Sequence, residues 1–407
     1  MARMTITKPT GDRSMKTVGL EPGCAGGTRT SGCRRIGRLA LAACLSLTLL
    51  TGLPACRSKE SDPQPTVPTT STIQQTTAST AESAPTTSSA PTPSPTPTLI
   101  PTPTPIPVLR SPTSGKLLEA PMVYKPVGVM IENSVGARPQ AGLQAADVVY
   151  EAPVEGCTRF FCIFNDTMPE SVGPVRSARL YFVRMQQEWD SAYVHAGGPQ
   201  SGLSNVYKES SSHIDTRIDI NKGAYARFYW RVDEREAPHN AYVNTVQCQE
   251  AMDQVSQGRT FQFAEQVQYD GPLISEIVLP FYIGKVTYRY DAASDKLLRY
   301  MGSKPFLDAD TGAAVAVTNL IVQSCHFYHG EETYGRWLAD LTGEGKAEFF
   351  IGGKHMTGTW ERSAYDQPTL YRDAAGQEIV LRPGNTWIAL HPQEKAITVS
   401  YDEVGIG

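Results

Sequence analysis

The residue types best suited to binding or chemistry are concentrated in segment 171–179, which reads SVGPVRSAR. Gly173 precedes a predicted helix over residues 176–189, whose first turn would present Arg176, Ser177 and Arg179. Free N–H groups at a helix start carry partial positive charge. Arginines three residues apart share one helix face and bind a carboxylate or phosphate through two hydrogen bonds. Because Gly173 would let the backbone approach a ligand closely, the pattern predicts an anion-binding site.

A second candidate lies where a predicted strand ends in His195 and is followed by Gly197 and Gly198. Ligands of open α/β sheets gather beyond the carboxyl ends of the strands. We therefore expect His195 and segment 173–179 to share one crevice. A single histidine at a strand end is more often a hydrogen-bonded structural residue, so this spacing is only weakly specific.

Two carboxylates, Glu151 and Glu155, are four residues apart and would share one face of a strand, as a pair of acid and base groups requires. A turn at Gly156 would break that register. Two further cations, Arg138 and Arg159, complete the candidate ligand-binding residues.

An alternative of equal weight is that these arginines have a structural role. In it Arg176 or Arg179 pairs with a carboxylate of a neighbouring strand, drawn from Asp147, Glu151 and Glu155.

The sequence leaves open whether the protein is an enzyme. The leading hypothesis is a ligand-binding module in which Arg176, Arg179 and His195 recognise an anionic group of a cell-envelope component. One alternative is a hydrolase or transferase with His195 as base and Glu151 or Glu155 as its partner. Another is a scaffold for a protein partner. Because the chain has no serine-nucleophile, phosphate-loop or zinc-protease motif, we expect no cofactor and no metal.

Strands alternate with helices in the first part of the folded chain. We expect strands over residues 127–131, 147–153, 158–164 and 191–196, and helices over 176–189, 199–207 and 245–255. A hairpin turn is expected at Gly156. These patterns predict a mixed α/β domain over residues 114–262.

The second part is dominated by strand patterns with polar turns between them. Strands are expected over residues 276–279, 285–290, 296–301, 315–323, 347–351 and 378–381. Trp360 and Trp387, with Tyr288, Tyr290 and Tyr300, are expected in the core rather than on a sugar-stacking face. The prediction is a β-rich domain of barrel or sandwich type over residues 263–407, and hence an α+β fold class.

Residues 1–56 have the features of a lipoprotein signal peptide. Arg34, Arg35 and Arg38 precede the apolar run 39–50, which leads to Leu53-Pro54-Ala55-Cys56. A permanent transmembrane helix needs about 20 apolar residues, so this run is too short to be one. Cys56 is therefore predicted to carry a diacylglycerol and, on its amino group, an acyl chain such as palmitate. Simple secretion and an uncleaved anchor are the alternatives.

Residues 57–113 consist mainly of Thr, Ser, Pro and Gln, which cannot bury enough apolar surface to fold. We expect a disordered tether that holds the folded part away from the membrane. The net charge of −4 disfavours nucleic-acid binding. The protein is therefore predicted to be exported and lipid-anchored on the outer side of the cell membrane. Four cysteines follow the tether, and their pairing stays open: Cys157, Cys162, Cys248 and Cys325.

Several short motifs together resemble the YerB-like lipoproteins. They are Arg138-Pro-Gln-Ala-Gly142, Asp147-Val-Val-Tyr-Glu151, Thr158-Arg159-Phe, Gly173-Pro-Val-Arg-Ser-Ala-Arg179, Val194-His195-Ala-Gly-Gly198 and Gly384-Asn-Thr-Trp387. The resemblance implies a lipoprotein with an N-terminal α/β domain and a C-terminal β-rich domain, and it implies no reaction. Pro199 stands where a serine often follows the glycines in that family, so no serine nucleophile is expected there.

Overall fold

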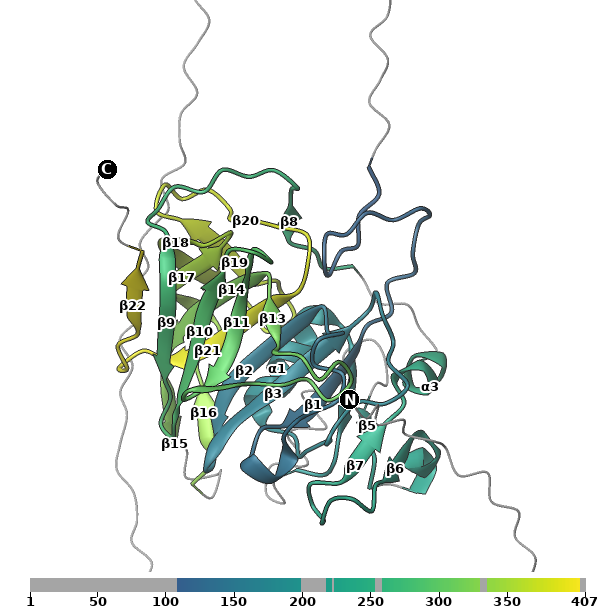
Figure 1. Cartoon of the computed structure of the whole chain (residues 1–407). Coiled ribbons are helices and arrows are strands. Elements are labelled where there is room, and N and C mark those ends of the chain that lie inside the picture. The colour runs from purple at the N-terminus through teal and green to yellow at the C-terminus, as the bar shows by residue number, and fades with distance from the viewer. Residues whose placement is uncertain (1–107, 199–216, 222, 253–257, 330–334, 403–407) are drawn as a thin grey trace, which may run out of the picture. The chain divides into compact units, whose positions relative to one another are not determined.

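The computed structural model describes residues 108–198, 217–221, 223–252, 258–329 and 335–402 (Figure 1). The predicted signal peptide, its Cys56, the tether up to residue 107 and the helix expected over 199–207 lie outside the described residues. Within the described part, no helix is both long and apolar enough to cross a membrane.

One ten-stranded sheet organises the described part, in the order β19-β18-β17-β14-β21-β2-β3-β1-β4-β5. Its strands are β1 (Val127–Glu132), β2 (Val148–Val154), β3 (Cys157–Phe164), β4 (Ala192–His195), β5 (Arg217–Asp219), β14 (Asn319–Cys325), β17 (Gly343–Ile351), β18 (Lys354–Arg362), β19 (Leu370–Asp373) and β21 (Thr386–Pro392). The first and second parts of the sequence meet where β2 pairs with β21 in parallel. Both expected domains therefore contribute strands to one continuous sheet.

Most strands of the large sheet run in the same direction, so the two ends of these strands differ. β1, β2, β4, β5, β14 and β21 all run the same way, and β3 runs against its neighbours β1 and β2. The predicted hairpin between β2 and β3 is confirmed, and its turn residue Gly156 has a φ of +82°. We call the end where β1, β2 and β4 finish the carboxyl edge, and the opposite end the amino edge.

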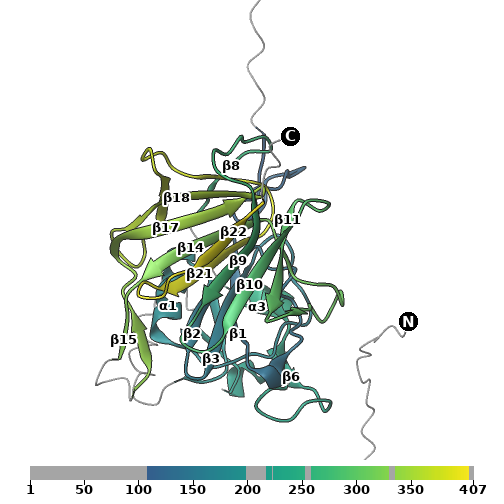
Figure 2. The ribbon, with the colours of Figure 1, turned by 60° about the vertical axis from the view of Figure 1, so that its left-hand side comes forward.

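A six-stranded sheet packs on one face of the large sheet (Figure 2). It contains β9 (Ile274–Pro280), β10 (Lys285–Asp291), β11 (Lys296–Met301), β12 (Lys304–Pro305), β13 (Ala316–Val317) and β22 (Thr398–Tyr401). Its Leu279 and Tyr288 share a buried core with Phe160 and Trp387 of the large sheet. The described part has many strands and few helices, in keeping with an α+β fold, and neither described sheet closes into a barrel. The sandwich expected within residues 263–407 does not form a separate domain, because the large sheet also contains β1 to β5 of the first part.

Helix α1 (Leu180–Trp189) covers the other face of the large sheet. Its Phe182 and Trp189 belong to a second buried core that also contains Phe161 and Tyr193. Because both faces are covered, β1 and β2 are buried along their whole length, which explains their continuous apolar sequences.

The predicted start of this helix at residue 176 is wrong. α1 begins at Leu180, and Arg179 is its N-cap in an extended conformation. The preceding residues pair instead with the end of β1, through Arg176 N–H to Met130 O at 2.9 Å and Glu132 N–H to Pro174 O at 2.9 Å. These strand-like bonds hold the segment extended, so the arginines do not lie in a first helical turn.

The remaining elements are short. They are η1 (Val135–Ala137), η2 (Gly223–Phe228), α3 (Thr245–Glu250), β6 (Tyr229–Arg231), β7 (Ala241–Val243), β8 (Gln262–Phe263), β15 (Phe327–His329), β16 (Trp337–Ala339) and β20 (Val380–Leu381). Asn244 is the N-cap of α3, because its side chain accepts a hydrogen bond from the Gln247 N–H. Trp360 and Trp387 are 3% and 1% exposed, as expected of core residues.

Candidate functional site

Charged side chains gather at the carboxyl edge. We call the six of them the edge cluster: Glu132, Glu155, Arg159, Arg176, Arg179 and His239. Glu132 ends β1 and lies directly opposite Arg159 of β3 in the sheet register. The extended segment before α1 adds the other two arginines, so the turn, the sheet and this segment build the cluster together.

Glu132 is the centre of one half of the cluster. Its side chain is only 4% exposed, and its carboxylate lies 3.3 Å from Arg176 Nε and 2.9 Å from His239 Nδ1. The Ser134 hydroxyl donates to the same carboxylate at 2.9 Å. A buried carboxylate stays ionised only with such partners, so Glu132 orients both Arg176 and His239.

Glu155 and Arg179 form the other half. Arg179 Nε donates to Glu155 Oε1 at 3.2 Å, which confirms the alternative that an arginine of this segment pairs with a strand carboxylate. Burial opposes ionisation of Glu155, but the hydrogen bond and charge of Arg179 outweigh it and lower the pKa of Glu155. The pair lies at the surface, because 39% of the Glu155 side chain is exposed.

Arg159 differs from its neighbours. The residue is 5% exposed and its Nη1 donates to the Ser177 carbonyl at 2.7 Å, but it forms no ion pair with any described carboxylate. Burial and the nearby charge of Arg179 lower its pKa to about 10, which still leaves it protonated at neutral pH. Arg159 is therefore a buried cation without a carboxylate partner in the described part of the chain.

The structure places segment 173–179 beside the residues that follow His195. Ser177 Oγ donates to the Ala196 carbonyl at 3.0 Å, and the Ala178 N–H donates to the Gly197 carbonyl at 2.9 Å. His195 itself is fully buried, with Nδ1 2.9 Å from the Gly197 carbonyl. Its position supports the structural interpretation of a strand-end histidine.

Gly173 makes room for protein rather than for a ligand. A side chain added there would come within 2.8 Å of the Ala241 carbonyl of β7. The Val175 N–H donates to that same carbonyl at 2.7 Å, so close packing of two chain segments accounts for the glycine.

Glu151 belongs to a separate network on the face of the sheet that meets the six-stranded sheet. Its Oε1 accepts from Arg299 at 2.7 Å and from the Thr158 hydroxyl at 2.6 Å. Arg138 reaches this network through Asn133, with Nε to Oδ1 at 3.0 Å. Glu151 and Glu155 are thus held by different arginines, and the expected acid–base pair of carboxylates is not formed.

The four cysteines that follow the tether are free thiols in the described structure. Burial raises the pKa of Cys157, the one thiol among them that is not fully buried. Because the thiolate is the nucleophilic form, Cys157 is not activated for catalysis.

Sequence reasoning missed Glu132 and His239. A signal for Glu132 was present, because it is the polar residue that ends an apolar strand, the same pattern that singled out His195. His239 stands in the polar run 231–240, and only the fold brings it against Glu132.

Comparisons with known proteins cover nearly all of the described chain. A family model described as the N-terminal domain of a protein of unknown function (DUF3048) matches residues 114–260, and the model of its C-terminal domain matches residues 277–388. A relative named "Putative lipoprotein YerB", from Bacillus subtilis (strain 168), is 30% identical over 314 residues, which are 72% of this chain and 90% of the relative. The crystal structure of the YerB protein from Bacillus subtilis matches with a TM-score of 0.61 and 29% identity, over 72% of this chain and 99% of that chain.

Proposed function

The chain belongs to the DUF3048 family of YerB-like lipoproteins, and from this premise we propose that it binds an anionic group of a cell-envelope component at the edge cluster. In this proposal the lipid on Cys56 anchors the protein outside the cytoplasm. The segment 57–107 gives the folded part its reach, because Ser111 and Thr113 at the end of the expected tether are buried in the folded part.

The observation that carries the proposal is the unpaired, buried guanidinium of Arg159. Removing a cation from water costs several kcal/mol unless a partner compensates it. A buried arginine without an ion-pair partner does not stabilise the folded chain. We therefore infer that a bound anion is the partner of Arg159. The planar guanidinium group matches a carboxylate or phosphate through two parallel hydrogen bonds.

The charges around Arg159 also favour an anion. Three arginines of the edge cluster face two glutamates, which leaves one positive charge when His239 is neutral. Glu155 is more exposed than Arg179, so it contacts the arginine from the solvent side. An incoming anion would therefore displace Glu155 from Arg179 and approach Arg159.

Binding by the full-length protein in detergent micelles tests the proposal. Soluble peptidoglycan fragments and inorganic phosphate are titrated by calorimetry into the wild type and into Arg159→Gln. We expect Arg159→Gln to weaken binding roughly tenfold or more, because a charge-assisted hydrogen bond contributes about 1.5–3 kcal/mol.

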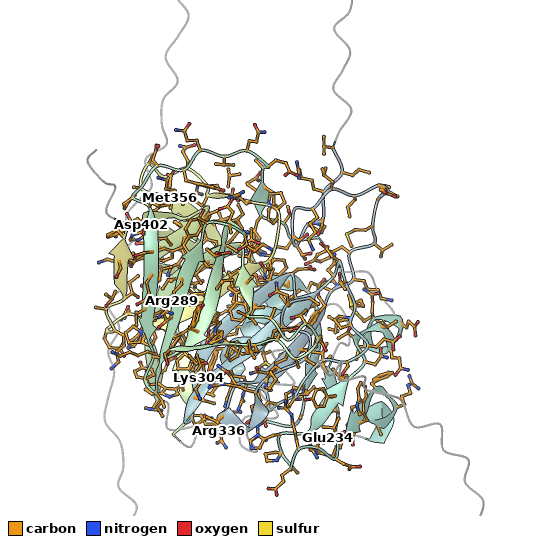
Figure 3. All side chains as sticks on the ribbon, viewed as in Figure 1. Glu234, Arg289, Lys304, Arg336, Met356 and Asp402 are labelled. Atoms are coloured by element: carbon orange, nitrogen blue, oxygen red, sulfur yellow. The ribbon has the colours of Figure 1, made fainter. Side chains whose placement is uncertain are left out.

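The matched control is Arg289→Gln, which removes an equal charge from an exposed ion pair with Glu276 on the six-stranded sheet (Figure 3). This variant should bind like the wild type. If Arg159→Gln binds every anion as tightly as Arg289→Gln does, the proposal is rejected.

The two alternatives have less support. A hydrolase with His195 as base needs that histidine to meet a substrate, but His195 is fully buried and Glu151 and Glu155 are engaged by Arg299 and Arg179. A protein-partner scaffold with a closed arginine–glutamate network would leave no arginine unpaired, and Arg159 does not fit that description.

A further inference from the structure

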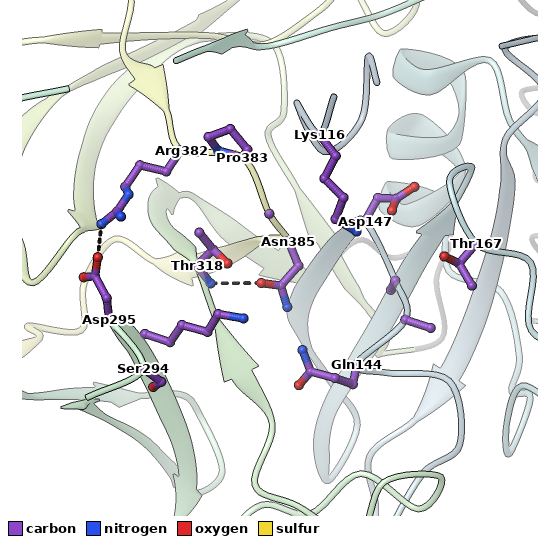
Figure 4. A pocket seen from close by; sticks show the side chains of 14 residues that line it. Lys116, Gln144, Asp147, Thr167, Ser294, Asp295, Thr318, Arg382, Pro383 and Asn385 are labelled. Carbon is purple, nitrogen blue, oxygen red and sulfur yellow. Dashed lines mark hydrogen bonds and ion pairs between the residues drawn. The ribbon is translucent and has the colours of Figure 1, made fainter. Parts of the chain in front are cut away.

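A polar pocket of about 420 Å³ lies at the amino edge, where β2, β14 and β21 begin (Figure 4). Six separate segments line it, and the residues used below are Lys116, Gln144, Asp147, Lys296, Thr318, Arg382 and Asn385. Its volume falls in the range of small-molecule sites. It shares no residue with the edge cluster, which lies at the opposite end of the same strands.

Two of the pocket's cations have no carboxylate partner. Arg382 is paired with Asp295, but Lys116 and Lys296 form no ion pair with any described residue. They come from distant parts of the sequence, the segment before β1 and the start of β11. A ligand that enters the pocket therefore meets two free ammonium groups.

Asp147 adds a buried acceptor to the lining. The residue is 2% exposed, and its Oδ2 accepts three bonds of 2.9 Å, from the Thr113 hydroxyl and from the N–H groups of Asn165 and Asp166. Its Oδ1 accepts no hydrogen bond from a described residue. One oxygen of this buried carboxyl group is thus left for a ligand.

The amide side chains of the pocket are already occupied. Asn385 donates to the Ala316 carbonyl at 2.9 Å and accepts from the Thr318 N–H at 2.9 Å. Gln144 bonds both to the Ala316 carbonyl at 3.1 Å and to its N–H at 2.8 Å. These hydrogen bonds fix the positions of the two amides in the pocket lining. We therefore expect the two lysines and Asp147 to make the polar contacts with a ligand.

We propose that this pocket binds a small, hydroxylated phosphomonoester. The phosphate lies between Lys116 and Lys296, and a ligand hydroxyl group hydrogen-bonds to Asp147 Oδ1. Lysine is a frequent phosphate ligand that acts as a point charge, and two of them match a group with close to two negative charges. The predominantly charged and polar lining excludes an apolar ligand.

Titration of the full-length protein in detergent micelles tests this site, with glucose 6-phosphate, glucose and inorganic phosphate as probes. The double variant Lys116→Gln/Lys296→Gln should bind glucose 6-phosphate at least about tenfold more weakly. Asp147→Asn should reduce the preference for glucose 6-phosphate over inorganic phosphate.

The matched control is Lys285→Gln/Lys304→Gln, which removes two exposed lysines at the other end of the β10–β11 hairpin (Figure 3). It should bind like the wild type. Arg159→Gln should lose only the phosphate binding of the edge cluster and keep the tighter binding of glucose 6-phosphate, which separates this pocket from the edge cluster. No binding of glucose 6-phosphate, equal binding of inorganic phosphate, or unchanged binding in the double lysine variant would each overturn the proposal.

Discussion

Replacing Arg159 by Met should leave the protein as stable as the wild type, or more stable. Burial and the charge of Arg179 lower the pKa of Arg159 from its ordinary value to about 10. Each pKa unit corresponds to about 1.4 kcal/mol, so the folded state disfavours the charged form by about 3 kcal/mol. Because the folded-state pKa is lowered, this penalty is fully present below pH 10, including at neutral pH.

The stability gained in Arg159→Met is partly offset by the loss of one hydrogen bond. Met cannot donate to the Ser177 carbonyl, and an unsatisfied buried acceptor costs about 1–3 kcal/mol. We therefore expect a net change between zero and about 2 kcal/mol of stabilisation. Loss of anion binding without loss of stability is the signature of a residue kept for function.

Arg299→Met is the matched comparison, because Arg299 is equally buried but paired with Glu151 at 2.7 Å. Breaking a buried pair leaves a carboxylate uncompensated and costs about 3–5 kcal/mol. Urea unfolding followed by tryptophan fluorescence measures both variants, since Trp360 and Trp387 are buried. If Arg159→Met destabilises the protein as much as Arg299→Met does, Arg159 is a structural ion-pair residue and the reasoning fails.

Three further predictions concern the edge cluster, the amino-edge pocket and the anchor. Glu155→Gln should strengthen anion binding in the calorimetric titration, because it frees Arg179, whereas equal or weaker binding would show that Glu155 is not a competitor. Burial and the charge of Asp166 raise the pKa of Asp147 to about 7, so the wild type should lose stability as the pH rises from about 4 to 7 and change little above that range. Asp147→Asn should remove up to about 4 kcal/mol of this loss, which urea midpoints at about pH 4 and 8 would measure; an unchanged pH profile would contradict the assignment. Cys56→Ser should shift the protein out of the membrane fraction, because the diacylglycerol is attached to the thiol; unchanged fractionation would exclude the lipid anchor.

The sequence predicted individual elements better than it predicted their ends. The four strands expected in the first part and the hairpin at Gly156 are present, because their apolar residues and turn glycine act locally. The start of α1 was misplaced by four residues. Helical periodicity extended back to residue 176, but backbone pairing with β1 competes for the same N–H groups and prevails.

The sequence patterns named four of the six residues of the edge cluster, but they could not distinguish the roles of these residues. Arg159, Arg176 and Arg179 are of one residue type and differ in what faces them, which only the fold defines. Glu151 and Glu155 looked like a pair because they are four residues apart. The turn after β2 and the second sheet direct them to different arginines.

The sequence by itself determined the local features of this protein, including the apolar strands, the turn at Gly156 and the N-cap of α3. The pattern of residues 1–107 also depends only on composition and order, and it stays a prediction of a signal and tether. Ser111 and Thr113, at the end of the expected tether, are instead buried in the folded part. Only the tertiary structure decided that β2 pairs with β21 and that Arg159 has no carboxylate partner among the residues that the structure describes. The physical reason is that strand pairing and ion pairing join residues far apart in the chain, and no local pattern encodes which of several arginines a carboxylate will reach.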